Sequence, residues 1–110
     1  MKSDISTLTE EIVKFRDRRD WKQFHNAKDL ALALSIEASE LNELFLWKTH
    51  DEYDAQRLAD ELADVLTYAL LLAHETKLDV RNIIRSKMEK NKKRYPVKKS
   101  KGLAKKYNEI

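Results

Sequence analysis

The sequence predicts an all-α protein with four main helices. Among its 110 residues there is only one glycine and one proline, so few residues would interrupt a helix. Alanine, leucine, glutamate and lysine, which all favour helix, dominate the composition. Apolar residues also recur at helical spacing in several segments. A chain of this length suits one domain with a single core.

The first two predicted helices cover residues 4–19 and 28–47. In the first, the apolar positions with helical spacing are Ile5, Leu8, Ile12, Val13 and Phe15. The polar segment DWKQFHN should end this helix. In the second, one apolar face is formed by Leu30, Leu34, Leu41 and Leu44.

A third helix is predicted to follow residues 49–52. The sequence THDE at these positions has the form of a capping box, in which Thr49 caps a helix and Glu52 reaches back to it. After a short irregular start, the helix should reach about Thr76.

A fourth helix and a basic tail complete the predicted chain. Asp79 is a suitable N-cap, and the helix should end near Arg94 because Pro96 restricts the residue before it. We see no repeat and no internal domain boundary. Residues 1–96 are therefore expected to form one helical domain, and residues 97–110 a loosely held basic tail.

Charge is unevenly distributed along the chain, although the formal net charge is only +3. Between Arg85 and Lys106 there are eleven basic residues and one acid, so this segment carries +10 and the remainder −7. Such a segment is typical of a solvated tail or of contact with nucleic acid. A non-catalytic helical module that binds nucleic acid or protein is therefore one hypothesis for the function.

Other features of the composition indicate the compartment. The chain has no cysteine, which excludes disulfides and thiolate zinc sites and fits a reducing environment. The N-terminal segment lacks the apolar core of a signal peptide. The longest apolar run, residues 65–73 with one threonine, is far short of the roughly 20 residues that span a bilayer. We expect a soluble, cytoplasmic protein without a membrane partner.

Two predicted helices each carry a pair of acids among apolar residues. Glu37 and Glu40 are three residues apart, so their Cβ atoms should lie about 5–6 Å apart on one helical face. Glu61 and Asp64 repeat this spacing in the next helix, and Tyr68 lies one turn further along. The surrounding apolar residues indicate that both pairs point inward or into a groove.

Four carboxylates in one place require compensation. A single pair of this kind is common on a solvated helix face, but two pairs at core-like positions would repel one another, and burial would force protonation. A hard divalent cation removes this problem, because Mg²⁺ prefers oxygen ligands and completes its shell with water and substrate phosphates. The two pairs therefore predict a Mg²⁺ site, in which Mn²⁺ could substitute.

Two other kinds of site are disfavoured. A di-iron site in a helical bundle asks for Glu-x-x-His on two helices, and no glutamate here has a histidine three residues later. The chain also lacks the glycine-rich loop that cradles phosphates in Walker-type sites. Side chains and metal would have to bind phosphates instead, and the predicted fourth helix offers Lys87, Asn91 and Arg94 on one face.

The sequence around these residues resembles that of a known family. The segments FRDRRDWKQFH, EASELNELFLWK, DELADVLTYALLLA and SKMEKNKKRYPV resemble the MazG-like all-α nucleoside triphosphate pyrophosphohydrolases, and within them the dCTP pyrophosphatase branch. The resemblance covers nearly the whole chain. It implies a four-helix bundle that is a homodimer or a homotetramer. The implied reaction is Mg²⁺-dependent hydrolysis of a (d)NTP, with dCTP the expected substrate, to the monophosphate and pyrophosphate, and it requires no nucleic acid.

The resemblance also assigns site residues. The positions that match the family's magnesium ligands, and hence the catalytic residues, are Glu37, Glu40, Glu61 and Asp64. The positions that match contacts around the nucleotide are Trp21, His25, Trp47 and Tyr68. The positions that fall where the last helix approaches the phosphates are Lys87, Asn91, Arg94 and Tyr95. A dUTP-directed or broad (d)NTP pyrophosphatase is the nearest alternative, and Glu40 and Glu43 are both candidates for the general base.

An apolar helix surface predicts self-association. The segment VLTYALLLA is apolar around most of the helix, whereas a surface helix of a small monomer should keep a polar face. One face must turn to the acids, so another needs a partner. We expect a homo-oligomer built on the second and third helices.

Overall fold

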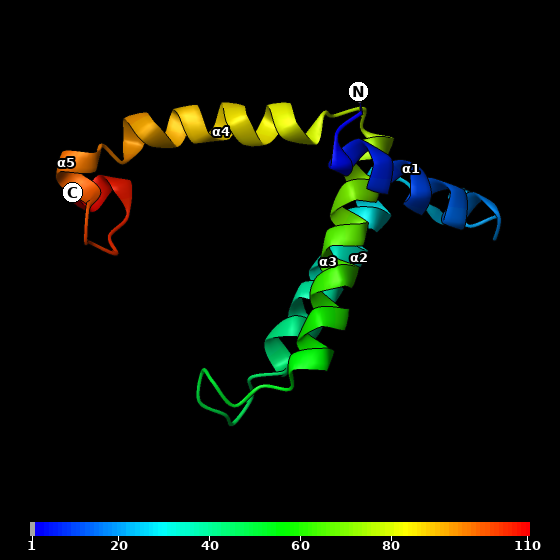
Figure 1. Ribbon diagram of the computed structural model, residues 1–110, viewed down its shortest axis with the longest axis horizontal. Coiled ribbons are helices and arrows are strands. Elements are labelled where there is room, and N and C mark those ends of the chain that lie inside the picture. The colour runs from blue at the N-terminus through cyan, green and yellow to red at the C-terminus, as the bar shows by residue number, and fades with distance from the viewer. Residues whose placement is uncertain (1) are drawn as a thin grey trace. The chain divides into compact units, whose positions relative to one another are not determined.

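A computed structural model describes residues 2–110. Within this range every regular element is helical, in agreement with the all-α prediction (Figure 1). The elements are α1 (Asp4–Asp17), a 3₁₀ turn (Lys22–Phe24), α2 (Ala27–Glu43), α3 (Ala55–Glu75), α4 (Val80–Arg94), α5 (Val97–Ser100) and a second 3₁₀ turn (Tyr107–Glu109). They form two compact units, the first ending at Leu78 and the second beginning at Asp79, which are described separately.

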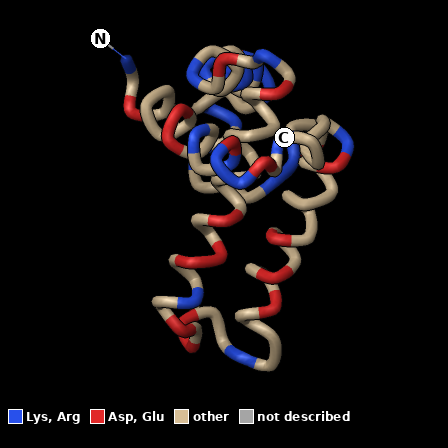
Figure 2. Tube along the Cα trace, turned by 90° about the vertical axis from the view of Figure 1, so that its right-hand side faces the viewer, with Lys and Arg blue, Asp and Glu red and all other residues tan. Residues whose placement is uncertain are grey.

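The first unit is built around the pair α2 and α3, which lie side by side and run in opposite directions (Figures 1 and 2). Leu30 and Leu44, from the apolar face predicted for the second helix, are buried. Leu71 and Ala73 of α3 are buried as well. Leu30 and Leu44 are two heptads apart in the sequence, a spacing that keeps residues on the same side of a helix. The core is small, so much apolar surface of both helices remains exposed.

Helix α1 packs against α3 through a buried charge. Arg16 is only 2% exposed, and its Nη1 atom donates a hydrogen bond to Glu75 Oε1 at 2.7 Å. Its Nε atom donates to Asp17 Oδ1 at 3.1 Å. Two carboxylates thus compensate a guanidinium that is almost fully removed from water. This ion pair joins the end of α1 to the end of α3.

Each main helix begins at a side chain that caps its free backbone amides. Ser3 accepts from the Ser6 amide, and Asn26 accepts from the Asp29 amide. Asp79 accepts from the Asn82 amide at 3.0 Å, which confirms the predicted cap of α4. The predicted end of α4 at Arg94 is also confirmed.

The other predicted boundaries need correction. Helix α1 ends at Asp17 rather than at residue 19, and α2 ends at Glu43 rather than at residue 47. After Glu43 the amides bond three residues back instead of four, so the chain tightens into turns that lead to Trp47, whose φ is +62°. A ring contact between Phe45 and Tyr53, 5.5 Å between centroids, holds the α2–α3 loop together.

The predicted cap of α3 was wrong. Thr49 and Glu52 do interact, and the Thr49 amide donates to the Glu52 carboxylate at 3.4 Å. This contact lies within the loop, however, and α3 begins three residues after it. Asp54 is the N-cap, because its carboxylate accepts from the amides of both Gln56 and Arg57.

The second unit differs from the predicted loose tail. After Pro96 the chain forms the single turn of α5, and the 3₁₀ turn near the C-terminus brings Tyr107 back beside Tyr95 at the end of α4. Aromatic contact thus gives the tail a defined path. The assignment of residues 1–96 and 97–110 as domain and tail stays a prediction.

Within residues 2–110, no helix has the length and apolar character needed to cross a membrane.

Candidate metal centre

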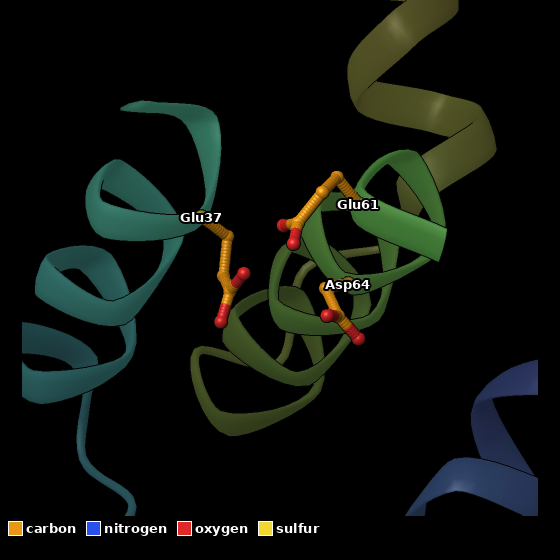
Figure 3. Close-up of side chains that lie close together, drawn as sticks. All are labelled: Glu37, Glu61 and Asp64. Atoms are coloured by element: carbon orange, nitrogen blue, oxygen red, sulfur yellow. The ribbon is translucent and has the colours of Figure 1, made fainter. Parts of the chain in front are cut away.

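Helices α2 and α3 bring three acids together (Figure 3). Glu37 projects from α2 toward α3, where Glu61 faces it and Asp64 lies beside Glu61. One carboxylate oxygen of each residue lies within 4.8 Å of the other two. Figure 2 shows that acids recur along both helices of the pair, but only these three among the described residues converge in this way.

The two central acids are poorly compensated by protein groups. Glu37 and Glu61 are half-buried, and the Oε2 atom of each is removed from water without a hydrogen-bond partner. A buried oxygen of this kind is costly unless a proton or a cation satisfies it. Asp64 is exposed and keeps the centre open to solvent.

The electrostatics of Glu37 reflect this crowding. Burial is the largest cause that raises its pKa, from 4.5 to about 7, and the neighbouring carboxylates of Glu40, Glu61 and Asp64 raise it further in the same direction. Near neutral pH the site therefore holds a carboxyl group that readily exchanges its proton for another positive charge.

These properties fit a hard divalent cation. Carboxylate oxygens are the ligands that Mg²⁺ prefers, and an exposed side leaves room for water or for a substrate's oxygens. Glu40, the fourth predicted ligand, lies one turn beyond Glu37 and is exposed. It is close enough to raise the pKa of Glu37, but it is not among the three residues whose oxygens converge. Its place in the metal site stays a prediction.

The raised pKa of Glu37 predicts the pH dependence of stability in the metal-free protein. The folded chain retains a proton between pH 4.5 and about 7 that the unfolded chain releases. The free energy of unfolding should therefore decrease as the pH rises through this window. A shift of this size corresponds to at most about 3 kcal/mol, and contact with water should reduce it to about 1–2 kcal/mol. Urea unfolding in EDTA at several pH values measures this decrease in the free energy of unfolding.

A matched variant isolates this effect from other titrating groups. Glu37→Gln keeps the size of the side chain but cannot ionise, so its stability should lack the decrease between pH 4.5 and 7. Added Mg²⁺ should stabilise the natural protein most at the upper end of this range, where the carboxyl groups are free to bind it. Superimposable pH curves for the two metal-free proteins would contradict the assignment.

Two predicted nucleotide contacts, Trp21 and His25, lie near the end of α1. Trp21 is partly exposed and packs edge-on against Phe15, with ring centroids 5.9 Å apart. His25 is half-buried, and its Nδ1 atom has no partner. Burial lowers the pKa of His25, Arg16 lowers it further, and Glu75 opposes them.

This electrostatic environment locates His25 near the end of α3. Glu75 is eleven residues after Asp64 on the same helix, which corresponds to about 16 Å along the axis. His25 thus neighbours the Arg16–Glu75 pair rather than the three converging acids. Its predicted contact with a nucleotide, like that of Trp21, stays a prediction.

The other two predicted nucleotide contacts differ sharply in exposure. Trp47 is 99% exposed in the α2–α3 loop, so it takes no part in the core of this chain. Tyr68 is half-buried on α3, one turn beyond Asp64 as expected. An indole without any packing contact is available to stack on a partner.

The four predicted phosphate contacts belong to the second unit. Lys87, Asn91 and Arg94 are exposed on α4, and Lys87 lines a hollow of about 390 Å³ with Asn82, Ile83, Ser86 and Lys90. Tyr95 is half-buried at the C-cap, where its amide donates to the Asn91 carbonyl at 2.7 Å. All four residues lie in the unit that begins at Asp79.

Sequence reasoning missed the pair formed by Arg16 and Glu75. One signal was available, because Arg16 lies four residues after Ile12 and three after Val13 and therefore on the apolar stripe of α1. An arginine at such a position indicates a buried cation with an acidic partner. Nothing in the sequence identified Glu75 as that partner.

Comparison with known proteins defines the class. Residues 32–110 match the MazG-like family, and the chain belongs to this family. It is 40% identical over 105 residues to dCTP pyrophosphatase 1 of Bos taurus and 42% identical to that of Mus musculus. Each match includes 88% of this chain but 62% of the relative, so the chain spans less than two thirds of the length of these proteins.

A solved structure supports the same class of fold. The crystal structure of a pyrophosphatase from Archaeoglobus fulgidus matches with a TM-score of 0.81 and 33% sequence identity, over 87% of this chain and 95% of that one. The resemblance stated from the sequence is thus confirmed for the family and the fold.

Proposed function

We propose that this chain is a Mg²⁺-dependent nucleoside triphosphate pyrophosphohydrolase that converts a (d)NTP, preferentially dCTP, to the monophosphate and pyrophosphate. The convergence of Glu37, Glu61 and Asp64, with two buried oxygens that lack partners, carries this proposal. The substrate is supported by the relatives named dCTP pyrophosphatase 1. Because the proposed substrate is an intracellular metabolite, a cytoplasmic location belongs to the same proposal.

The acids of α2 and α3 have separate tasks in this reaction. Glu37, Glu61 and Asp64, with Glu40, would hold Mg²⁺, which when bound polarises phosphoryl oxygens and lowers the pKa of water. A proton must leave the attacking water, and a carboxylate that is not fully committed to metal can accept it. Glu40 fits this task better than the three converging acids, because it is exposed and interacts with Glu37 without belonging to the converging oxygens. Glu43 remains the other candidate.

A turnover panel tests the proposed reaction. The protein is incubated with dCTP, dUTP, dTTP, dATP, dGTP and CTP, with Mg²⁺ or with EDTA, and pyrophosphate and monophosphate are quantified. We expect the highest kcat/KM with dCTP, equal amounts of both products, and no turnover in EDTA. A different preferred base would correct the specificity. Release of inorganic phosphate alone, or no turnover of any nucleotide, would overturn the proposal.

Trp47 is expected to contribute to binding of the base rather than to the metal site. Stacking of a base on an aromatic ring is worth about 1–3 kcal/mol, so Trp47→Ala should weaken nucleotide affinity by about five- to a hundredfold. Because the side chain is 99% exposed, the folding of the chain itself should not suffer. Calorimetry with nucleotide and with Mg²⁺ alone separates the two sites. Equal loss of both would assign Trp47 to the support of the metal centre instead.

We also propose that the active form is a homodimer or homotetramer. Leu32 and Ile36 on α2 and Leu62 and Leu66 on α3 are all 44–57% exposed, which leaves large apolar side chains uncovered on both helices of the acidic pair. A second copy that covers them would bury this apolar surface.

Sedimentation at micromolar concentration checks the assembly. The natural protein should sediment as a dimer or tetramer of the 13.0 kDa chain. Leu66→Glu should shift it toward monomer, because a charge would be buried in the interface. Leu8→Glu, at a similarly exposed position on α1, is the control and should assemble normally. A single active species near the mass of one chain would contradict the proposal.

A further inference from the structure

The end of α4 is held by a tyrosine from the C-terminal segment. The guanidinium carbon of Arg94 lies 4.8 Å from the ring centroid of Tyr107. The same ring meets Tyr95 edge to face, with the two centroids 6.2 Å apart and the planes at 88°. Tyr107 therefore contacts two consecutive residues at the point where the helix ends.

A defined backbone path brings Tyr107 to this position. The turn of α5 follows Pro96, whose carbonyl accepts from two amides further along. The direction then changes at Gly102, the single glycine of the chain, which has a φ of +79°. Residues with a Cβ atom rarely adopt this conformation, with asparagine the best tolerated. The 3₁₀ turn that starts at Tyr107 closes the path with a bond of 2.9 Å between the Glu109 amide and the Lys106 carbonyl.

The guanidinium of Arg94 is available to bind an external anion. Among the described residues, Arg94 has no carboxylate within ion-pair distance, whereas nearby Lys92 is paired with Glu89 at 2.8 Å. A guanidinium that rests on the face of a ring keeps the N–H groups at its edge available. Those groups can form two parallel hydrogen bonds to a phosphate. The arginine thus keeps its full donor capacity while the ring limits its rotamers.

We propose that Tyr107 is a positioning residue that holds Arg94 in an orientation suited to phosphate binding. This inference rests on the proposed function and on the predicted role of Arg94 as a phosphate contact. The aromatic ring acts through the arginine and does not touch the substrate. The C-terminal segment, predicted to be a loosely held tail, then contributes to phosphate binding through Arg94.

Loss of the contact between Arg94 and Tyr107 should have a measurable effect on phosphate affinity. A cation–π contact at an exposed site corresponds to about a two- to fivefold change in affinity. Tyr107→Ala should raise KM for dCTP and the dissociation constant of inorganic tripolyphosphate with Mg²⁺ by about this factor, while kcat stays nearly constant. Tyr107→Phe retains the ring and should behave as the natural protein. Lys105→Ala removes a charge from the same segment and is the control for a general electrostatic effect.

A double-mutant cycle shows whether Tyr107 acts through Arg94. Arg94→Ala should weaken tripolyphosphate binding more than Tyr107→Ala does, since the charge itself is lost. In the Arg94→Ala background, Tyr107→Ala should have no further effect on KM or on tripolyphosphate binding. An undiminished effect in that background, or a natural KM for Tyr107→Ala, would overturn the proposal.

Gly102 provides an independent test that leaves both side chains intact. Gly102→Val should be strained by the positive φ and displace Tyr107, so it should reproduce the rise in KM of Tyr107→Ala. Gly102→Asn tolerates this φ and should bind tripolyphosphate normally. Equal affinities for the two Gly102 variants would count against the proposed path of the chain.

Turnover of dCTP and its dependence on Tyr107 are measured separately. If the natural protein releases pyrophosphate from dCTP but its KM does not depend on Tyr107, the positioning role is overturned and the function stands. If no nucleotide is turned over, the function is overturned, and with it the inference that rests on it.

Discussion

Replacing Glu61 by alanine is expected to lower kcat/KM for dCTP by at least about a hundredfold. Glu61 faces Glu37 across the α2–α3 pair, and its Oε2 atom is buried without a protein partner. Loss of this carboxylate removes a metal ligand from the interior of the site, where water replaces it poorly. Pyrophosphate release at saturating Mg²⁺ measures the effect.

The other members of the two pairs should behave similarly. Glu37→Ala, Glu40→Ala and Asp64→Ala are each expected to abolish most activity. Asp60→Ala is the matched control, because Asp60 lies on the same helix but bonds to Gln56, outside the converging acids. Natural rates for the Glu37 and Asp64 variants would refute the assignment.

Folding should survive these substitutions. Removal of one like charge from a metal-free cluster relieves repulsion, so the melting temperature in EDTA should stay constant or rise. With Mg²⁺ added, the natural protein should gain stability that the variants lack. A large fall of the melting temperature in EDTA would mean that the acids support the fold rather than the chemistry.

Replacing Arg16 by alanine is expected to destabilise the chain by about 2–4 kcal/mol. Its guanidinium is buried and bonds to Glu75 at 2.7 Å, so the variant leaves an uncompensated carboxylate at the α1–α3 contact. The carbonyl of Arg16 also accepts from the Trp21 amide at 3.2 Å, so a shift of α1 would carry Trp21 with it. Urea unfolding measures the stability, and the fluorescence of Trp21 in a Trp47→Phe background reports its displacement.

Removal of both charges separates the cost of an unpaired ion from the value of the pair. The double variant Arg16→Met, Glu75→Met should recover much of the stability lost in Arg16→Ala, because neither charge is left buried alone. Glu75→Gln should be milder than Arg16→Ala, since Glu75 is the more exposed partner. If Arg16→Ala unfolds at the same urea concentration as the natural protein, the ion pair has no net role.

The local features of this protein follow from its sequence alone. The scarcity of glycine and proline and the helical spacing of leucines determine the all-α class, because helix formation depends on neighbours within one or two turns. The same local geometry places Glu61 and Asp64 side by side, and the cap at Asp79 and the stop before Pro96 are equally short-range. The family resemblance rests on these same local segments.

The tertiary structure decides which helices meet and how their ends are modified. Only the packing of α2 on α3 brings Glu37 opposite Glu61 and Asp64 while Glu40 stays outside the converging oxygens. The packing of α1 on α3 likewise buries Arg16 against Glu75, a residue 59 positions away. Such contacts depend on the path of the whole chain, and no local pattern encodes them. The early end of α2 accompanies the ring contact between Phe45 and Tyr53 in the following loop, and the return of Tyr107 to Arg94 is likewise a contact between separate segments.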